Sequence, residues 1–144
     1  MSGWLLDTNV LSELRRKQPS PAVVDFVSAQ PLDRLFVSEV TFAEIRFGIE
    51  LVSEPARRAE LRQWLDHRLR PMFTHRVLAI TEDILLDWRL IIEAGPKAGH
   101  TFSHPDVLIA ATASRHGLAV VTRDPSDFVA AGVTAIDPWI AKVP

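Results

Sequence analysis

The stretch WLLDTNVLSEL, residues 4–14, is an apolar run that is interrupted by Asp7 and then resumes with a different spacing. Before the aspartate the apolar residues are consecutive, which is typical of a short buried strand over Trp4–Asp7. After it, from Val10 to Leu14, they recur at the spacing of one helical face. Aspartate is also a preferred residue at the N-terminal cap of a helix. The stretch therefore predicts a buried strand that turns directly into a helix, with a carboxylate at the junction.

The rest of the chain continues to alternate between strand and helix patterns. Further strands are predicted at Leu35–Val37, Val77–Ile80, Leu118–Thr122 and Val133–Ile136. Helices are predicted at Asn9–Lys17, Pro21–Gln30, Ser38 to about Val52, Pro55 to Leu69–Pro71, Thr81–Ala94 and His104–Arg115. The glycines and the proline of Gly95–Thr101 predict a loop. This alternation predicts an α/β fold in which a parallel sheet of about five strands lies between two layers of helices.

The composition narrows the class of protein. A length of 144 residues suits one domain, and nothing indicates a boundary within residues 1–144. The absence of cysteine excludes disulfides, thiolate zinc sites and a cysteine nucleophile. The net charge of −2 gives no general attraction for a polyanion, so such binding would need local arginines or a bound metal. Without a signal-peptide pattern or an apolar run of roughly 18 residues, we expect a cytoplasmic protein without a membrane partner.

Four acidic residues stand where a predicted strand ends or a predicted helix begins. They are Asp7, Glu44, Asp106 and Asp124. Because the carboxyl ends of parallel strands meet in one crevice, we expect these side chains to converge. Gathered carboxylates repel one another unless a cation neutralises them, and oxygen ligands of this kind suit Mg²⁺ or Mn²⁺. The pattern predicts a metal-dependent hydrolase, with nucleic acid as its substrate.

Each acidic residue also has a purely structural explanation. Asp7 is a good helix cap, and Glu44 in a first turn complements the helix dipole. Ser103–Asp106 has the spacing of a capping box, and Asp124 suits a turn. Asp127, one turn further on, can assist or replace Asp124. Their joint placement favours the metal site, because like charges a few ångströms apart in a partly dry site cost several kcal/mol.

Four segments together resemble the PIN-domain family of nucleases, and among them the VapC-type toxins of bacterial toxin–antitoxin modules, including the FitB-like branch. The segments are LLDTNVLSEL, VSEVTFAEIRFGI, DVLIAATASRHGLAVVTRD and the trailing DF…GV…DPW. They match in order and spacing, and the likeness covers nearly the whole chain. The resemblance implies a PIN-like three-layer α/β/α fold around a central parallel sheet.

The resemblance also implies roles for particular residues. Asp7, Glu44 and Asp106 would form the acidic core, with Asp124 as its fourth member. Thr8 or Asn9 and Ser38 would line the site as polar supports. Many relatives carry asparagine at the position of Asp124 and aspartate at that of Asp127, so which of these two acids faces the metal stays open.

From these residues we hypothesise hydrolysis of an RNA phosphodiester. Asp7, Asp106 and Asp124 would hold one or two Mg²⁺ or Mn²⁺ ions, with Glu44 bound directly or through water. Glu44 or Asp124 would orient or deprotonate the attacking water. Arg46 and Arg123 are candidates to contact phosphate. The histidines lack metal-ligand spacing, so we do not expect zinc.

The resemblance further implies partners. It implies a homodimer and a cognate VapB-like antitoxin that inserts a segment, often with an arginine, into the acidic pocket. DNA would be bound only indirectly, through the antitoxin. The alternative is a non-catalytic partner module of an antitoxin–DNA regulatory complex, whose acidic pocket docks a basic peptide. A phosphatase of the haloacid dehalogenase type is disfavoured, because it needs an aspartate where this chain has Asn9.

The predicted helix after Pro55 carries two further patterns. Its arginines are interpreted as a solvated face balanced by neighbouring acids; they are Arg57, Arg58, Arg62, Arg68 and Arg70, and the acids are Glu54, Glu60 and Asp66. An apolar stripe is interpreted as core packing, with dimerisation as the alternative. The stripe consists of Leu61, Trp64, Leu65 and Leu69.

Overall fold

The computed structural model of the chain describes residues 3–97 and 102–140. Its strands form one sheet in the order β3-β2-β1-β4-β5, and all neighbouring strands are parallel. The strands are β1 (Trp4–Leu6), β2 (Leu35–Ser38), β3 (Val77–Leu78), β4 (Ala119–Val121) and β5 (Ala135–Ile136). The predicted parallel sheet is thus confirmed. Because the chain winds outward from β1 in both directions, the switch point of the sheet lies at the carboxyl end of β1.

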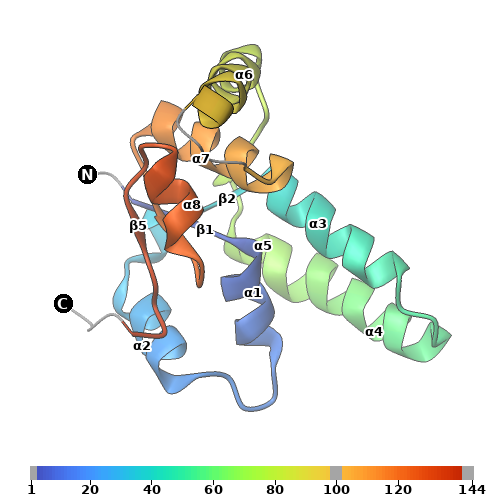
Figure 1. The fold of residues 1–144 in the computed structure, drawn as a ribbon. Helices are drawn as coiled ribbons and strands as arrows, with labels where there is room; N and C mark the ends of the chain where they lie inside the picture. Colours follow the sequence, from blue (N-terminus) through green and yellow to red (C-terminus); the bar gives the residue numbers. More distant parts are fainter. Residues whose placement is uncertain (1–2, 98–101, 141–144) are drawn as a thin grey trace.

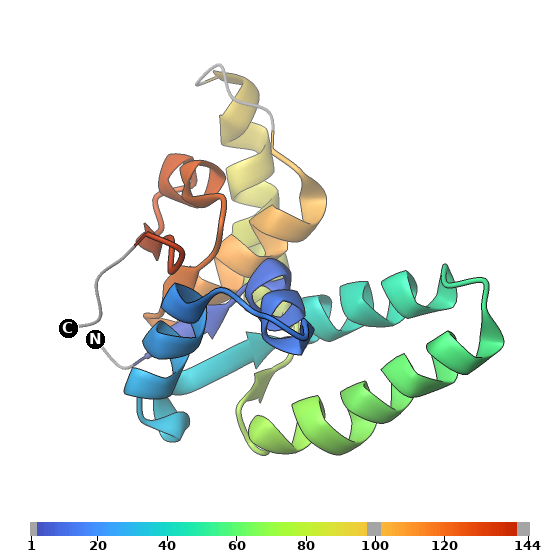
Figure 2. The ribbon, with the colours of Figure 1, turned by 90° about the horizontal axis from the view of Figure 1, so that it is seen from below.

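Helices surround this sheet on both faces (Figures 1 and 2). In the first half they are α1 (Thr8–Arg15), α2 (Pro21–Ala29), the short η1 (Leu32–Arg34) and α3 (Glu39–Glu50). Then follow α4 (Pro55–Trp64), the π-helical turn η2 (Leu65–Leu69), α5 (Arg70–Met72), α6 (Glu82–Lys97), α7 (His104–His116) and α8 (Pro125–Ala130). Figure 1 shows α3 and α4 as a long pair that projects away from the sheet. Among the described helices, none has the length and apolar character needed to cross a bilayer.

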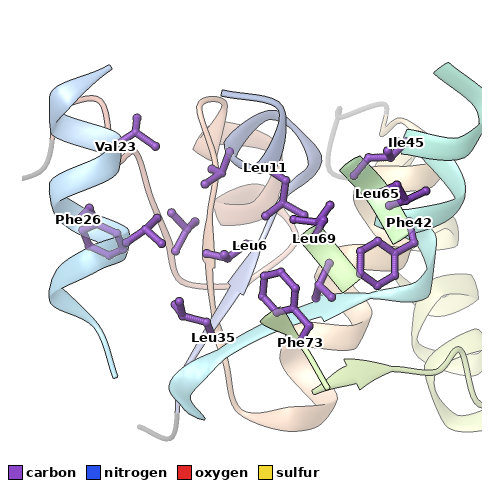
Figure 3. Close-up of a cluster of buried hydrophobic side chains, with 14 of the residues drawn as sticks. Leu6, Leu11, Val23, Phe26, Leu35, Phe42, Ile45, Leu65, Leu69 and Phe73 are labelled. Carbon is purple, nitrogen blue, oxygen red and sulfur yellow. The ribbon is translucent and has the colours of Figure 1, made fainter. Parts of the chain in front are cut away.

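The core follows from the alternation of side chains along the strands. Successive strand residues point to opposite faces of a sheet. Accordingly, Leu6 and Val121 belong to a core cluster with α1 to α4, while Leu5 and Val120 belong to a second cluster with α7 and α8. Figure 3 shows side chains of the first cluster, contributed by strands and by helices that flank them. Since β1 and β4 are buried on both faces, their uninterrupted apolar sequences are explained.

The π-helical turn keeps one long helical segment in contact with the core. Residues four apart drift by about 40° per step on an α-helix, so a strict four-residue repeat slowly leaves the buried face. The wider turn η2 takes up this drift. As a result Leu61, Leu65 and Leu69 all stay buried, with exposed fractions of 9%, 3% and 3%. Core packing therefore accounts for these leucines of the stripe.

Most of the predicted helix boundaries are confirmed by their caps. The Ser38 hydroxyl accepts a hydrogen bond from the Val40 N–H at 3.1 Å, and the Thr81 hydroxyl accepts one from the Ile84 N–H at 3.3 Å. Gly117 ends α7 in the left-handed conformation with φ of 66°. Glycine adopts this conformation without the penalty that a Cβ would bring.

Three predicted boundaries are wrong. The loop over Gly95–Thr101 does not begin at Gly95, because α6 continues to Lys97, and the rest of that prediction lies outside the described residues. The strands predicted at Val77–Ile80 and Val133–Ile136 are each only two residues long. Both lie at the edges of the sheet, where only one neighbour supplies hydrogen bonds.

One prediction concerns the first core cluster. Phe73 is fully buried and makes an edge-to-face contact with Phe42 at 6.4 Å between ring centroids. We expect Phe73→Ala to lower the free energy of unfolding by about 3–5 kcal/mol, measured by denaturant titration. Phe47→Ala is the matched control, because Phe47 is 65% exposed, and it should cost no more than about 0.5 kcal/mol. Equal losses for the two variants would contradict this description of the core.

Candidate functional site

Asp7 lies at the switch point of the sheet and is held by several donors. It follows β1 directly and forms the N-terminal cap of α1, where its Oδ1 accepts a hydrogen bond from the Thr8 N–H at 2.8 Å. Its Oδ2 accepts from the Thr122 hydroxyl at 2.8 Å and, more weakly, from Asn9 Nδ2 at 3.4 Å. Asp7 as a whole is only 6% exposed. The structure thus makes Asp7 both a helix cap and the buried centre of a polar network.

Glu44 reaches the same place from α3. This helix begins at its Ser38 cap, at the carboxyl end of β2, and carries Glu44 about a turn and a half further on. The Thr8 hydroxyl donates a hydrogen bond to Glu44 Oε1 at 3.1 Å, which joins α1 to α3. No described residue is hydrogen-bonded to Glu44 Oε2. That oxygen is therefore left to meet a ligand.

Asp106 enters the site from the first turn of α7. Ser103 occupies the cap position of that helix, but its hydroxyl makes no capping bond to the backbone. It forms a hydrogen bond with the Asp106 carboxylate instead. The predicted capping box is therefore wrong, because the Ser103 side chain does not bond the backbone of the first turn. Ser103 is nevertheless the cap residue, and Asp106 lies in the first turn as predicted. The serine side chain thus lowers the pKa of Asp106 and does not cap the helix.

The two remaining acids come from the start of α8. Asp124 is the cap residue of this helix, yet its side chain makes no capping bond, and its backbone N–H donates to Thr122 Oγ1 at 3.2 Å. Asp127 follows in the first turn. The negative charges of both aspartates raise the pKa of Asp106, and the charge of Asp124 also raises that of Asp7. Both acids thus act electrostatically on the same centre.

The pKa values of three carboxyl groups rise together. Burial is the largest cause for each of Asp7, Glu44 and Asp106, because it disfavours the charged form. Hydrogen bonds oppose this rise, from Thr122 and Thr8 to Asp7 and from Thr8 to Glu44. Mutual repulsion adds to it, because Asp7 and Asp106 both raise the pKa of Glu44. The carboxylates predicted from distant segments therefore lie close enough for their charges to interact.

These side chains border a hollow of about 600 Å³, which we call the acidic hollow. Its lining residues are Asp7, Thr8, Asn9, Ser12, Glu13, Arg15, Arg16, Glu44, Asp106, Arg123 and Trp139. Ser38, which was expected to support the site, does not line the acidic hollow. It is fully buried and caps α3. Asp124 and Asp127 are not among the lining residues and contribute through their charge.

The two arginines expected near phosphate are placed differently. The Arg123 guanidinium lies over the Trp139 ring at 4.8 Å, at the acidic hollow, and the Arg123 backbone N–H donates to Asn9 Oδ1 at 3.2 Å. Arg46 instead lines a separate hollow with Arg62 and Arg70, between α3 and α4. Arg123 is therefore available to a ligand of the acidic hollow, and Arg46 faces another surface.

Thr122 is a part of the site that the sequence analysis missed. It is fully buried, donates to Asp7, and accepts hydrogen bonds from Asn9 Nδ2 and from the Asp124 N–H. One side chain thus links the ends of β1 and β4. Its signal in the sequence is slight: a single hydroxyl at the end of an otherwise apolar strand.

The donor set fits a hard divalent cation. The clustered side chains offer carboxylate oxygens, which Mg²⁺ and Mn²⁺ prefer. Within residues 3–97 and 102–140, neither Asp7, Glu44 nor Asp106 has an ion pair with a basic residue. In the same residues, no three acidic or histidine side chains already stand at distances that would enclose an ion. The arrangement is thus a group of carboxylates without ion-pair partners among the described residues, at the border of a hollow.

The fold and the acidic hollow define an α/β protein with a carboxylate centre at the switch point of its sheet. The family model described as PIN domain matches residues 4–132. The chain belongs to the PIN-domain family.

Relatives match along nearly their whole length. Plasmid stability protein StbB of Pseudomonas syringae pv. tomato is 40% identical over 137 residues, covering 95% of this chain and 99% of the relative. VapC ribonuclease Y4jK of Sinorhizobium fredii is 37% identical, with coverage of 94% and 96%. Toxin FitB of Neisseria gonorrhoeae is 36% identical, with coverage of 94% and 97%.

Solved structures share the fold. A chain in the crystal structure of FitAcB from Neisseria gonorrhoeae matches with a TM-score of 0.90 at 35% identity, covering 96% of this chain and 99% of that chain. A chain in the structure of FitAB bound to an IR36 DNA fragment matches with a TM-score of 0.90 at 33% identity, covering 96% and 97%. These likenesses confirm the predicted PIN-like α/β/α architecture.

The repulsion within the acidic hollow has a consequence for stability. The pKa of Asp106 is raised in the folded protein by burial and by neighbouring carboxylates, so its ionised form destabilises the fold. This destabilisation sets in as the pH rises from the ordinary pKa of aspartate through the raised one. In EDTA, Asp106→Asn should therefore match the parent in acid and become more stable than the parent as the pH approaches neutrality.

Denaturant unfolding at a series of pH values measures this difference. Asp33→Asn is the control, because Asp33 is an exposed aspartate of η1 outside the acidic hollow. An advantage of Asp106→Asn that stayed constant with pH would contradict the mutual repulsion of the carboxylates.

Proposed function

We propose that this chain is a metal-dependent endoribonuclease that acts as the toxin of a type II toxin–antitoxin module. The observation that carries the proposal is the convergence of Asp7, Glu44 and Asp106 on one hollow. Burial raises the pKa of each of these groups, and the negative charge of acidic neighbours raises it further. Membership of the PIN-domain family supports a nuclease. The relatives named VapC ribonuclease and toxin FitB support RNA hydrolysis and the role of a toxin.

The cofactor we propose is Mg²⁺ or Mn²⁺. Asp7, Glu44 and Asp106 would hold it, with Asp124 and Asp127 adding negative charge from the start of α8. When bound, such a cation lowers the pKa of a water molecule and stabilises charge that develops on the phosphate. Binding would also relieve the repulsion among the carboxylates, so it should stabilise the folded protein.

The residues of the site have distinguishable roles in this mechanism. Asp7 accepts hydrogen bonds through both of its oxygens, which fixes its position at the end of β1. Glu44 is bound through Oε1 only, so Oε2 can accept a proton from the attacking water or orient it. Arg123, at the rim and stacked on Trp139, is placed to contact a substrate phosphate.

The partners follow from the same proposal. We expect a cognate VapB-like antitoxin that places a basic segment in the acidic hollow and supplies contact with DNA. The solved structure of FitAB with a DNA fragment supports such an assembly. We further expect a homodimer, and we place the activity in the cytoplasm. The alternative of a non-catalytic partner module gives no account of relatives that are named ribonucleases.

Catalysis can be tested by substitution of the carboxylates. In Mn²⁺ or Mg²⁺ the purified chain should cleave single-stranded RNA, and EDTA should abolish cleavage. Asp7→Asn, Glu44→Gln and Asp106→Asn should each lower the rate at least about a hundredfold, because each removes a negative oxygen ligand or the proton acceptor. Product formation from end-labelled RNA measures the rate.

The matched control is Glu39→Gln, since Glu39 is an exposed glutamate on the same helix as Glu44. Its activity should equal that of the parent. Comparing Asp124→Asn with Asp127→Asn shows which of the two is the fourth acid, because only its loss should approach the effect of Asp7→Asn. Full activity after Asp7→Asn or Asp106→Asn would exclude this mechanism. Loss of antitoxin binding without any detectable cleavage by the parent would favour the non-catalytic alternative.

The homodimer has a candidate surface on α6. Leu86 and Leu90, one turn apart, are 55% and 59% exposed. We expect light scattering to give the mass of two chains for the parent and of one chain for Leu86→Glu with Leu90→Glu, because buried carboxylates would oppose association. Val129→Glu on α8, where Val129 is 60% exposed, is the control and should remain dimeric. A dimer that survives the double change uses another surface.

A further inference from the structure

A second hollow adjoins the acidic one. It has a volume of about 900 Å³ and lies between the end of α1 and the α4–η2 segment, and we call it the cationic groove. The residues of its lining include Arg15, Arg16, Lys17, Arg57, Trp64 and Arg68. Arg15 and Arg16 line both hollows. The views in Figures 1 and 2 agree that α1 lies beside the pair of helices α3 and α4.

The groove gathers positive charge, of which only a part is neutralised by acids. Arg16 pairs with Glu13 and Arg57 pairs with Glu60. In the part of the chain that the structure describes, Arg15, Lys17 and Arg68 have no carboxylate within ion-pair distance. This accumulation stands out in a chain whose net charge is −2.

Arg15 shows that these charges act on one another. Its pKa is lowered, chiefly by burial and further by the positive charge of Arg57. Two arginines from helices far apart in sequence are thus brought together without a shared acid. Like charges placed side by side in this way favour an anion between them.

An aromatic side chain lies among these cations. Trp64 is half-buried, and the Arg15 guanidinium is 5.9 Å from the centre of its ring. Cations along a groove together with an aromatic face are the elements with which proteins bind single-stranded nucleic acid. The cations contact phosphates, and the ring stacks on a base of any identity.

The arginines that line hollows along α4, η2 and α5 have different surroundings. Arg62 pairs with Glu50, and Arg70 pairs with Asp66, as expected for a solvated and balanced face. Arg57 and Arg68 point to the other side, where α1 adds its own basic residues. The balanced interpretation therefore holds for the arginines that pair with an acid, Arg57 among them, and fails for Arg68, which lines the groove without one. Sequence alone does not show that α1 lies opposite Arg68.

We propose that the cationic groove binds the segment of single-stranded RNA that flanks the scissile phosphate. Arg15, Lys17 and Arg68 contact its phosphates, and Trp64 stacks on one of its bases. The inference rests on the proposed ribonuclease function and deepens it. An RNA strand that enters along the groove reaches the carboxylates directly, since Arg15 lines both hollows.

Binding and cleavage are measured separately to test this. A fluorescein-labelled single-stranded RNA of mixed sequence is titrated with Asp106→Asn protein in EDTA, where no cleavage is expected. Fluorescence anisotropy gives Kd as a function of salt. Adding Arg15→Gln and Arg68→Gln should weaken binding about tenfold to thirtyfold at roughly 0.1 M salt and reduce the salt slope by about 1.4. Trp64→Leu should weaken binding roughly fivefold or more, with a smaller change in the salt slope.

Cleavage in the parent background supplies the second readout. The arginine double variant should raise KM and leave kcat at saturating RNA within about twofold, because these residues hold the strand and not the reacting phosphate. The matched control is Arg89→Gln, since Arg89 lies on α6, pairs with Glu93 and lines neither hollow. Circular dichroism tests whether each variant folds. If Trp64→Leu does not fold, the variant with Arg15→Gln and Arg68→Gln still decides the outcome.

Each outcome decides between the two proposals. Unchanged RNA affinity in the arginine double variant, while the parent still cleaves RNA, would overturn the groove and leave the nuclease. Failure of the parent to cleave RNA with either metal would instead overturn the proposed function. If the double variant loses affinity for an acidic peptide and retains its affinity for RNA, the groove is a protein-binding surface. Equal competition by double-stranded RNA would also overturn the proposal, because a duplex cannot stack on Trp64.

Discussion

The fold and its chemistry depend on the burial of the Asp7 carboxylate at the end of the central strand. A buried charge without partners is strongly unfavourable, and here the Thr8 amide and the Thr122 hydroxyl reduce that cost at 2.8 Å each. These bonds fasten the start of α1 and the end of β4 to the end of β1. The Thr8 hydroxyl extends the network to Glu44 and so to α3. The groups that stabilise the switch point of the sheet are thus the groups that orient the site.

The apolar residues of the strands stabilise the fold, and the acidic residues beyond the strand ends form the site. Below the carboxyl ends of the strands, apolar side chains alternate between the two core clusters and supply the stabilising burial. At the carboxyl ends, burial and repulsion raise the pKa values of Asp7, Glu44 and Asp106. A site of this kind costs stability, and the two cores offset that cost. The carboxylates therefore remain close together although none of them has a basic partner among the described residues.

The sequence predicted the acidic site better than its surroundings, for a physical reason. Asp7, Glu44 and Asp106 are visible because each stands at the junction of a strand or helix with apolar neighbours, and parallel strands bring such junctions together. Ser103 stands at the start of α7, as predicted, but its hydroxyl interacts with Asp106 and not with the backbone. The spacing of residues does not show which of two nearby groups a hydroxyl contacts. Thr122 was missed, since its bonds run to a residue 115 positions away. The cationic groove was missed as well, because it exists only where α1 meets α4.

The π-helical turn η2 connects the core to this outer surface. One residue more than an α-helical turn is accommodated between Leu65 and Leu69, and everything beyond it is rotated accordingly. Deleting a single residue there would close the π-helical turn to an α-helical one, and the helical segments on either side would keep nearly their present orientation. Deleting a residue within the regular helix α4 would instead turn the side chains before the deletion by about 100° relative to those after it. Length variation by one residue is therefore best tolerated at η2, because a shortened turn there keeps the leucines before and after it on the same side.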